Sequence, residues 1–546
     1  MTRFHWQNPY PTVRQPVFAR NVVSTSHPLA AQAGLRMLWQ GGNAVDAALA
    51  AAAALTVVEP VSCGLGGDAF ALVWDGEALS GLNASGTAPA AWNPDYFRAR
   101  HGEDGHGHAR QPERGWDTVT VPGVIAGWEA LHARFGSLPF ADLLAPAIEL
   151  AERGHAVASI VAQKWAAAVP ALHDQPGFGA AFLPRGRAPE VGERVVMPGH
   201  ANTLRLLARD GARAFYEGEP GAALAAFARE TGGALTADDL RGYRPEWVEP
   251  ISKSFRGHTV HEIPPNGQGI AALIALGIVE RFDLAGLPLD SAEAQHVQIE
   301  AMKLAFADVY RYVADPRAME VTPGAMLDDA YLAERAKRID PARATHFEHG
   351  MPRSGGTVYL SAADERGMMV SFIQSNYMGF GSGLVVPGYG ISLQNRGRGF
   401  SMDPASPNVV AGGKRPFHTI IPAFATRERA GRREAVMSFG VMGGDMQPQG
   451  HLQTLVRMLG YGQQPQAACD APRWKVNRDF TLDVEHTLGR DVVAALEARG
   501  HRLQSIDDPY MDFGSGQFIW RLDADDPERG YVAASDSRRD GLAAGF

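Results

Sequence analysis

Two short β-prone runs follow a pair of glycines near position 355, and this stretch constrains the fold more than any other part of the chain. The runs cover residues 357–363 and 368–375, and only the polar segment 364–367 separates them. Runs of this length joined by so short a turn predict an antiparallel hairpin. Thr357 is then the first residue of the first strand, directly after Gly356.

A threonine at such a position suggests a specific chemistry. Its hydroxyl is a weak nucleophile unless a base removes the proton, and the base can be its own α-amine if the residue begins a chain. That amine has a pKa of roughly 7.7–8.0, so it is partly neutral near pH 7. Gly355 and Gly356 allow backbone conformations that would expose the Gly356–Thr357 bond to the adjacent hydroxyl. A glycine-rich loop leading into an ordinary strand is the alternative for these three residues alone.

Blocks elsewhere in the chain match a known family in the same order. They are GGNAVDA (41–47), EP (59–60) with GLGG (64–67), VPG (121–123), KRP (414–416), GG (443–444), APR (471–473) and ASDSR (534–538). With the segment after Thr357, these blocks resemble the γ-glutamyltranspeptidase family of N-terminal nucleophile hydrolases over nearly the whole chain. The resemblance implies an α+β fold, a four-layer αββα sandwich. It also implies a precursor that cuts itself into chains 1–356 and 357–546, which stay together as a heterodimer or as a dimer of heterodimers.

The resemblance assigns catalytic roles to four residues. Thr357 is the nucleophile, and its freed amine is the general base. Ser375 stands where the family has a threonine whose hydroxyl bonds the nucleophile. Gly443 and Gly444 would offer backbone N–H groups to the oxyanion of an acyl-transfer transition state; losing one such donor typically costs roughly 2.7–4 kcal/mol.

The substrate-binding positions depart from the family pattern. The residues at or beside these positions are Ser85, Asn376, Tyr377, Arg396, His418 and Thr419. Ser85 replaces an arginine that holds a carboxylate, and the acidic partner of an α-amine is lost while Arg396 is gained. This exchange favours a substrate carboxylate over an ammonium, with His418 as a second possible donor. Arg396 as a structural ion-pair partner is the alternative.

These departures predict an amidohydrolase that cleaves the amide of a small, carboxylate-bearing substrate through an acyl-enzyme. Specificity like that of the oxamate amidohydrolases is favoured. A true glutathione hydrolase or γ-glutamyltransferase with a rebuilt pocket and a cephalosporin-acylase-like enzyme are the alternatives within the class. An uncleaved, inactive binding protein is the alternative outside it.

Bulk composition gives further expectations about binding partners, disulfides, metals and location. A net charge of −9 gives no reason to expect nucleic acid or a membrane. Two cysteines, Cys63 and Cys469, exclude a disulfide framework. No metal or cofactor motif stands out, and the histidine-rich stretch at 101–115 is interpreted as a solvated loop. The N-terminus has no apolar signal region, so a cytoplasmic location is expected.

Overall fold

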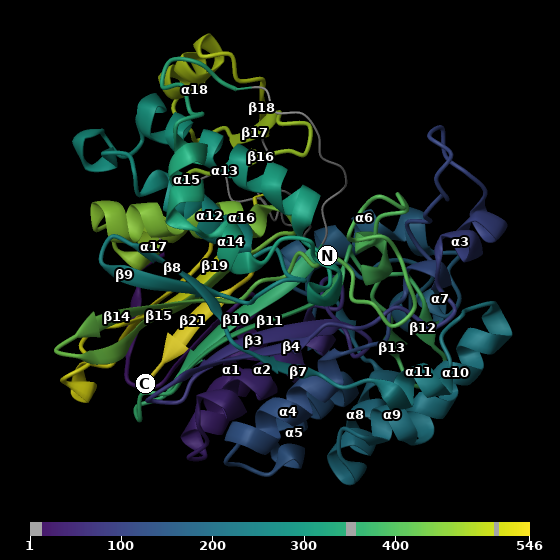
Figure 1. Ribbon diagram of the computed structural model, residues 1–546. Helices are drawn as coiled ribbons and strands as arrows, with labels where there is room; N and C mark the ends of the chain where they lie inside the picture. Colours follow the sequence, from purple (N-terminus) through teal and green to yellow (C-terminus); the bar gives the residue numbers. More distant parts are fainter. Residues whose placement is uncertain (1–13, 346–355, 507–512) are drawn as a thin grey trace.

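Two seven-stranded sheets stack face to face at the centre of the molecule, with helices on both outer faces (Figure 1). The computed structural model describes residues 14–345, 356–506 and 513–546. Residues 1–13, on which the expected location rested, and Gly355 lie outside these ranges. Every neighbouring pair of strands within the two sheets is antiparallel. The α+β sandwich of four layers that the sequence predicted is confirmed.

The first sheet has the order β1-β20-β19-β15-β14-β9-β8, and the second has the order β21-β2-β10-β11-β3-β4-β7. The strands of the first sheet are β1 (Val17–Ala19), β20 (Tyr531–Ser535), β19 (Ser515–Arg521), β15 (Arg432–Met442), β14 (Ala423–Arg429), β9 (His258–Glu262) and β8 (Ile251–Phe255). Those of the second are β21 (Leu542–Gly545), β2 (Val22–Thr25), β10 (Gly356–Ala363), β11 (Met369–Tyr377), β3 (Asp68–Trp74), β4 (Leu79–Ala84) and β7 (Glu246–Val248).

Helices from different parts of the chain cover the two sheets. On the second sheet lie α1 (Pro28–Trp39), α2 (Ala44–Val58) and α4 (Val124–Phe135), with α5 (Phe140–Arg153) packed on α2. On the first sheet lie α12 (Ile270–Val279), α16 (Met446–Leu455) and α17 (Pro465–Asp470), with α13 (Ala292–Tyr312) packed on α12. The helical layers lie on opposite sides of the stacked sheets (Figure 1).

The remaining elements lie around this centre. The helices are α3 (Pro94–His101), α6 (Ser159–Leu172), α7 (Phe178–Phe182), α8 (Pro198–Asp210), α9 (Ala214–Glu217), α10 (Glu219–Thr231), α11 (Ala237–Gly242), α14 (Pro323–Met326), α15 (Asp329–Ala336) and α18 (Arg490–Ala498). The short strands are β5 (His155–Ala156), β6 (Arg194–Val195), β12 (Val385–Val386), β13 (Ile391–Ser392), β16 (Trp474–Val476), β17 (Leu482–Glu485) and β18 (Leu503–Ile506).

Helix α2 shows how local sequence builds one of these layers. Asn43 caps it by accepting hydrogen bonds from the amides of Val45 and Asp46, and the Asp46 carboxylate accepts from the Asn43 amide in return. All fifteen residues of the helix are buried. Its alanines leave little side-chain volume, so the helix lies close to α1 and to the central strands β10 and β11.

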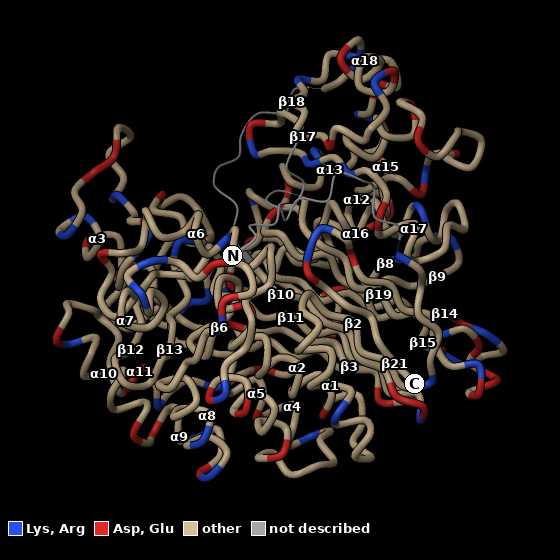
Figure 2. Tube along the Cα trace, turned by 180° about the vertical axis from the view of Figure 1, so that it is seen from behind, with Lys and Arg blue, Asp and Glu red and all other residues tan. Residues whose placement is uncertain are grey.

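The surface shows no single dominating charge. Lysine, arginine, aspartate and glutamate of both signs are interspersed along the outer helices and loops (Figure 2). Cys63 and Cys469 are buried free thiols. Across the described ranges, no helix combines the length and the apolar character that crossing a bilayer requires.

Candidate active site

Thr357 begins the central hairpin at a point where strand pairing is irregular. Gly356 lies opposite Tyr377 and Val358 opposite Gln374, so the register shifts at Thr357. A bulge of this kind redirects a side chain, and bulges are frequent beside active sites. The Thr357 hydroxyl oxygen lies 3.2 Å from that of Ser375, and both side chains are buried. The candidate nucleophile and its candidate partner are therefore within hydrogen-bonding distance.

Strand β15 of the facing sheet packs against β10 and ends directly before the two glycines. The hydroxyl oxygens of Ser361 and Ser438 are 2.7 Å apart, and a β-carbon at Gly440 would lie 2.4 Å from the Tyr359 ring. The two strands therefore run antiparallel across the interface between the sheets. Beyond Tyr359 the first strand leads back to Thr357, and beyond Gly440 strand β15 ends at Met442. Gly443 and Gly444 follow directly.

The Gly443-Gly444 turn has a backbone that favours glycine. Its φ angles are 128° and 58°, which side chains rarely allow. The Gly443 carbonyl accepts the Met446 amide at 3.0 Å, and the Gly444 carbonyl accepts the Gln447 amide at 3.2 Å. Within the described residues, no group accepts a hydrogen bond from the amide N–H of either glycine. Two main-chain donors thus remain available at the end of β15.

Asp68, Arg396 and His418 form a buried charged cluster, which adjoins Ser375 through Asp68. Asp68 is the partner of Ser375 in the pairing of β3 with β11. Its Oδ2 lies 3.6 Å from Arg396 Nε and 3.0 Å from His418 Nε2, and its Oδ1 accepts the Gly86 amide at 3.0 Å. Burial raises the pKa of Asp68 to about 7, although the neighbouring Arg396 acts to lower it. Burial lowers the pKa of Arg396 to about 10, so its guanidinium stays charged at pH 7.

His418 is the neutral member of this cluster and contacts Asp68. Burial and the Arg396 charge hold the pKa of His418 well below its usual value, so the imidazole is neutral. Its Nδ1 accepts the Ile420 amide at 3.4 Å, which leaves the proton on Nε2, facing Asp68. The imidazole therefore has no further N–H to offer, and the sequence-based role of His418 as a second donor to a substrate carboxylate does not fit this arrangement.

Thr419 and Tyr377 hold the rest of the Arg396 side chain. Arg396 NH1 donates to the Thr419 hydroxyl at 2.8 Å, and the guanidinium carbon lies 4.3 Å from the centre of the Tyr377 ring. Arg396 is fully buried, yet its NH2 has no hydrogen-bond partner among the described residues. A buried donor without a partner costs roughly 1–3 kcal/mol, so the site favours an acceptor there.

Asn376 and Ser85 do not join this group. Side chains alternate along β11, so Asn376 faces away from the interface between the sheets that Ser375 faces. Asn376 donates to the Ser392 hydroxyl at 3.1 Å and packs against Gly64. The Ser85 hydroxyl donates to Asn83 Oδ1 at 2.6 Å. The alternation of the strand thus places the Asn376 side chain on the opposite face of β11 from Ser375.

The sequence did not predict two residues of the site, Asp68 and Gln268. Asp68 follows the GLGG block, and an acid directly after a glycine run at the start of a strand was the available signal. Gln268 lies in the loop between β9 and α12, and its amide donates to the carbonyls of Thr419 and Gly444. A polar residue between glycines, just before a fully apolar helix, was the only signal there.

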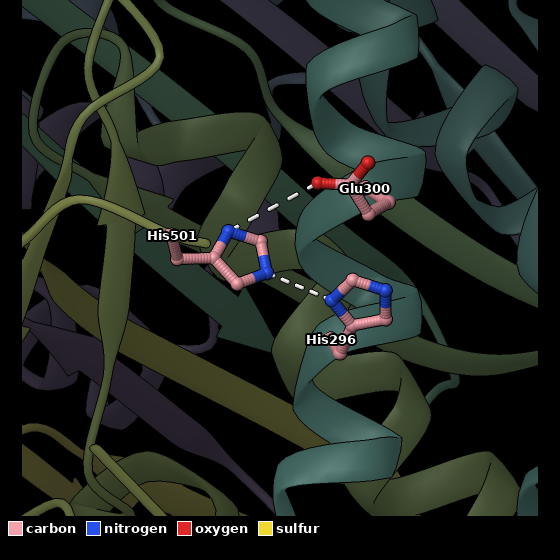
Figure 3. Close-up of side chains that lie close together, drawn as sticks. All are labelled: His296, Glu300 and His501. Atoms are coloured by element: carbon pink, nitrogen blue, oxygen red, sulfur yellow. Dashed lines mark hydrogen bonds and ion pairs between the residues drawn. The ribbon is translucent and has the colours of Figure 1, made fainter. Parts of the chain in front are cut away.

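A second cluster contains metal-ligating residue types. His296 and Glu300 are one helical turn apart on α13, and His501 comes from the loop before β18 (Figure 3). All three side chains are buried. The Lys303 ammonium lies among them, 2.8 Å from Glu300 Oε1 and 3.1 Å from His501 Nδ1. The positive charge that a cation would supply is therefore already present.

The hydrogen bonds of this cluster form a continuous relay. Lys303 donates to Nδ1 of His501, so the His501 proton sits on Nε2 and points to His296 Nδ1 at 2.8 Å. His296 Nε2 in turn donates to the Asp340 carbonyl at 2.8 Å. Glu300 accepts the Thr345 amide at 2.8 Å. The relay thus fastens residues 340–345 to the loop before β18.

An αββα sandwich whose central hairpin begins at a buried threonine has the architecture of the N-terminal nucleophile hydrolases. A solved structure described as cephalosporin acylase from Bacillus halodurans has the same fold, with a TM-score of 0.93 and 47% sequence identity. The alignment covers 100% of this chain and 99% of that one.

The sequence comparisons define the family within that class. The sequence model described as Gamma-glutamyltranspeptidase matches residues 30–546, and the chain belongs to this family. The glutathione hydrolase-like YwrD proenzyme of Bacillus subtilis is 35% identical over 96% of this chain and 98% of its own length. The oxamate amidohydrolase proenzyme of Klebsiella pneumoniae is 36% identical over 95% and 97%. The protein is therefore an enzyme of the hydrolase and acyltransferase type, as the sequence predicted.

Proposed function

We propose that the chain cleaves its own Gly356–Thr357 bond and then acts as an N-terminal threonine amidohydrolase, with subunits 1–356 and 357–546. The contact between Thr357 and Ser375 carries this proposal. The Thr357 hydroxyl attacks the Gly356 carbonyl, the peptide nitrogen leaves as an amine, and water hydrolyses the resulting ester. Only this cleavage converts the Thr357 nitrogen from a non-basic amide into a general base.

Turnover uses the same groups on an external amide. The α-amine of Thr357 takes the hydroxyl proton while the oxygen attacks the substrate carbonyl. The N–H groups of Gly443 and Gly444 stabilise the oxyanion that forms. The proton then passes to the departing nitrogen, which leaves as ammonia or an amine. Water hydrolyses the acyl ester and regenerates Thr357.

The acyl group is proposed to carry a carboxylate and no α-ammonium. Arg396 offers its buried NH2 for the carboxylate, with Thr419 and Tyr377 holding the guanidinium in place. Asp68 is already engaged by Arg396, His418 and the Gly86 amide, so it is a poor partner for a substrate ammonium. Oxamate, a carboxylate bonded directly to an amide, is the favoured substrate, and the oxamate amidohydrolase among the relatives supports it.

A cephalosporin-acylase-like activity is the second candidate. The 47% identity to the Bacillus halodurans enzyme, over the whole chain, favours it. Such a substrate also joins an acyl group to an amine through an amide, so the chemistry at Thr357 would be unchanged. Glutathione hydrolysis is the third candidate, since the Bacillus subtilis glutathione hydrolase proenzyme is 30% identical.

One set of assays tests these points. The wild type should give two bands on a denaturing gel, the smaller beginning Thr-Val-Tyr-Leu, and Thr357→Ala should stay whole and inactive. Ammonia release from oxamate is then compared with glutamate release from glutathione and with deacylation of a carboxylate-bearing cephalosporin amide. A wild type that stays whole overturns the proposed mechanism. Glutathione turnover as efficient as the others overturns the proposed acyl group.

The carboxylate site is tested separately. Arg396→Met should raise KM for the carboxylate-bearing substrate by roughly tenfold or more, because a charge-assisted pair is lost. Arg398→Met, in the same turn but half-buried, is the matched control and should change KM little. Equal effects of the two substitutions would assign Arg396 a purely structural role.

A further inference from the structure

We infer that Gln268 is a positioning residue that couples the oxyanion turn to the carboxylate site. Its side-chain Nε2 donates to two main-chain carbonyls, that of Thr419 at 2.7 Å and that of Gly444 at 2.9 Å. The side chain is fully buried. One amide nitrogen therefore connects the residue that holds Arg396 with the glycine proposed to bind the oxyanion.

The orientation of this amide has only one solution. Both partners are carbonyl oxygens, so the nitrogen and not the oxygen of the Gln268 side chain must face them. The main chain beneath it is also fixed. The Gln268 amide donates to the His418 carbonyl at 2.9 Å, and the His418 amide donates to the Asn266 carbonyl at 2.9 Å. These two backbone hydrogen bonds thus hold the main chain of Gln268 beside the charged cluster.

The oxyanion turn needs such a support. Two consecutive glycines at positive φ have many accessible conformations in the absence of packed side chains. The bond from Gln268 helps to fix the plane of the peptide after Gly444. The turn is then held from α16 by the Met446 and Gln447 amides and from outside that helix by Gln268. Oxyanion donors act only when they are held in place before the charge develops.

The second half of the coupling runs through Thr419. Its carbonyl accepts from Gln268, while its hydroxyl accepts from Arg396 NH1 at 2.8 Å. A displaced Gln268 would therefore loosen both the oxyanion donors and the guanidinium. This inference rests on the proposed function. It predicts a lower kcat for any acyl group and a higher KM only where the acyl group has a carboxylate.

Gln268→Met tests this with two acyl nitroanilides of equal length, one with a terminal carboxylate and one without. We expect kcat to fall by roughly a hundredfold on both, as for a misplaced oxyanion donor. KM should rise several-fold only for the carboxylate-bearing compound. Thr419→Val, which removes only the hydroxyl contact with Arg396, should raise that KM and lower kcat far less than Gln268→Met does. Identical behaviour of the two variants, or unchanged kcat in Gln268→Met, would overturn the inference.

Gln268→Glu provides a second test in case the methionine variant folds poorly. A protonated glutamate can donate to one of the two carbonyls, whereas an ionised one repels both. The ratio of its kcat to that of wild type should rise as pH falls. A ratio that does not change with pH would contradict a positioning role.

Hydrogen exchange separates failure of the inference from failure of the proposed function. Exchange of the amides of residues 443–447 should be faster in Gln268→Met than in wild type and unaltered in Thr419→Val. This measurement needs no substrate. If wild type turns over neither nitroanilide but the amides of Gln268→Met exchange faster, the proposed function fails while the positioning role stands. Unaltered exchange overturns the positioning role itself.

Discussion

At the scale of single residues, the site depends on hydroxyl groups brought together by strand geometry. Ser375 Oγ accepts the Tyr377 amide at 2.7 Å and lies 3.2 Å from Thr357. Ser375→Ala should therefore reduce kcat by roughly tenfold, the value of one hydrogen bond in a buried site. Ser375→Thr keeps the hydroxyl and should retain most activity. Steady-state kinetics on the fully cleaved enzymes decide this, and an alanine variant as active as wild type would remove Ser375 from the catalytic group.

The titration of Asp68 should appear in substrate binding. Its pKa of about 7 lies far above the ordinary value because the carboxyl is buried. Below pH 7 the neutral acid leaves the Arg396 charge uncompensated, whereas above pH 7 the carboxylate competes with a substrate anion. A small dicarboxylate should thus bind more weakly as pH rises through 7, and its inhibition constant should increase roughly tenfold. Asp68→Asn should remove this step, and a step that persists in the variant would assign it to another group.

At the scale of elements, the two β-prone runs and the short turn between them predicted the central hairpin closely. The hairpin spans Gly356–Ala363 and Met369–Tyr377, against predicted runs of 357–363 and 368–375. Strands β20 and β21 were not predicted, because their short alanine-containing runs are β-structure only through pairing with distant strands. The same limit applies to the site. Alternation along β11 decided between Ser375 and Asn376, and Asp68 and Gln268 acquire roles only from partners far away in sequence.

The buried ion pair between Lys303 and Glu300 on α13 gives a prediction about stability. Lys303→Met leaves the buried Glu300 carboxylate without its cation, which should cost about 3–5 kcal/mol and lower the thermal midpoint markedly. Lys337→Met removes an exposed ion pair with Glu334 and should change stability by less than about 0.5 kcal/mol. Because Lys303 occupies the centre of the cluster, a chelator should leave the wild-type midpoint unchanged. A large drop with chelator would instead identify a bound metal.

At the scale of the whole molecule, the proposed cut separates chains that both sheets hold together. In the second sheet, β10 pairs with β2, β11 with β3, and β21 with β2. In the first sheet, β14 pairs with β9 and β20 with β1. Each pair joins one strand from before position 356 to one from after it. The two subunits therefore share both sheets and both sets of core side chains, and neither has a complete sheet alone.

Cleavage should consequently leave size and cooperativity intact. The cut protein should elute under native conditions with both subunits in one particle, at 58.6 kDa or a multiple of it. It should unfold in a single transition, because separating the subunits requires breaking the strand pairs that form the core. The uncut Thr357→Ala chain is the control and should elute at the same volume. If the smaller subunit dissociates in denaturant before the β-sheet signal in circular dichroism is lost, the shared sheets do not hold the subunits together as described.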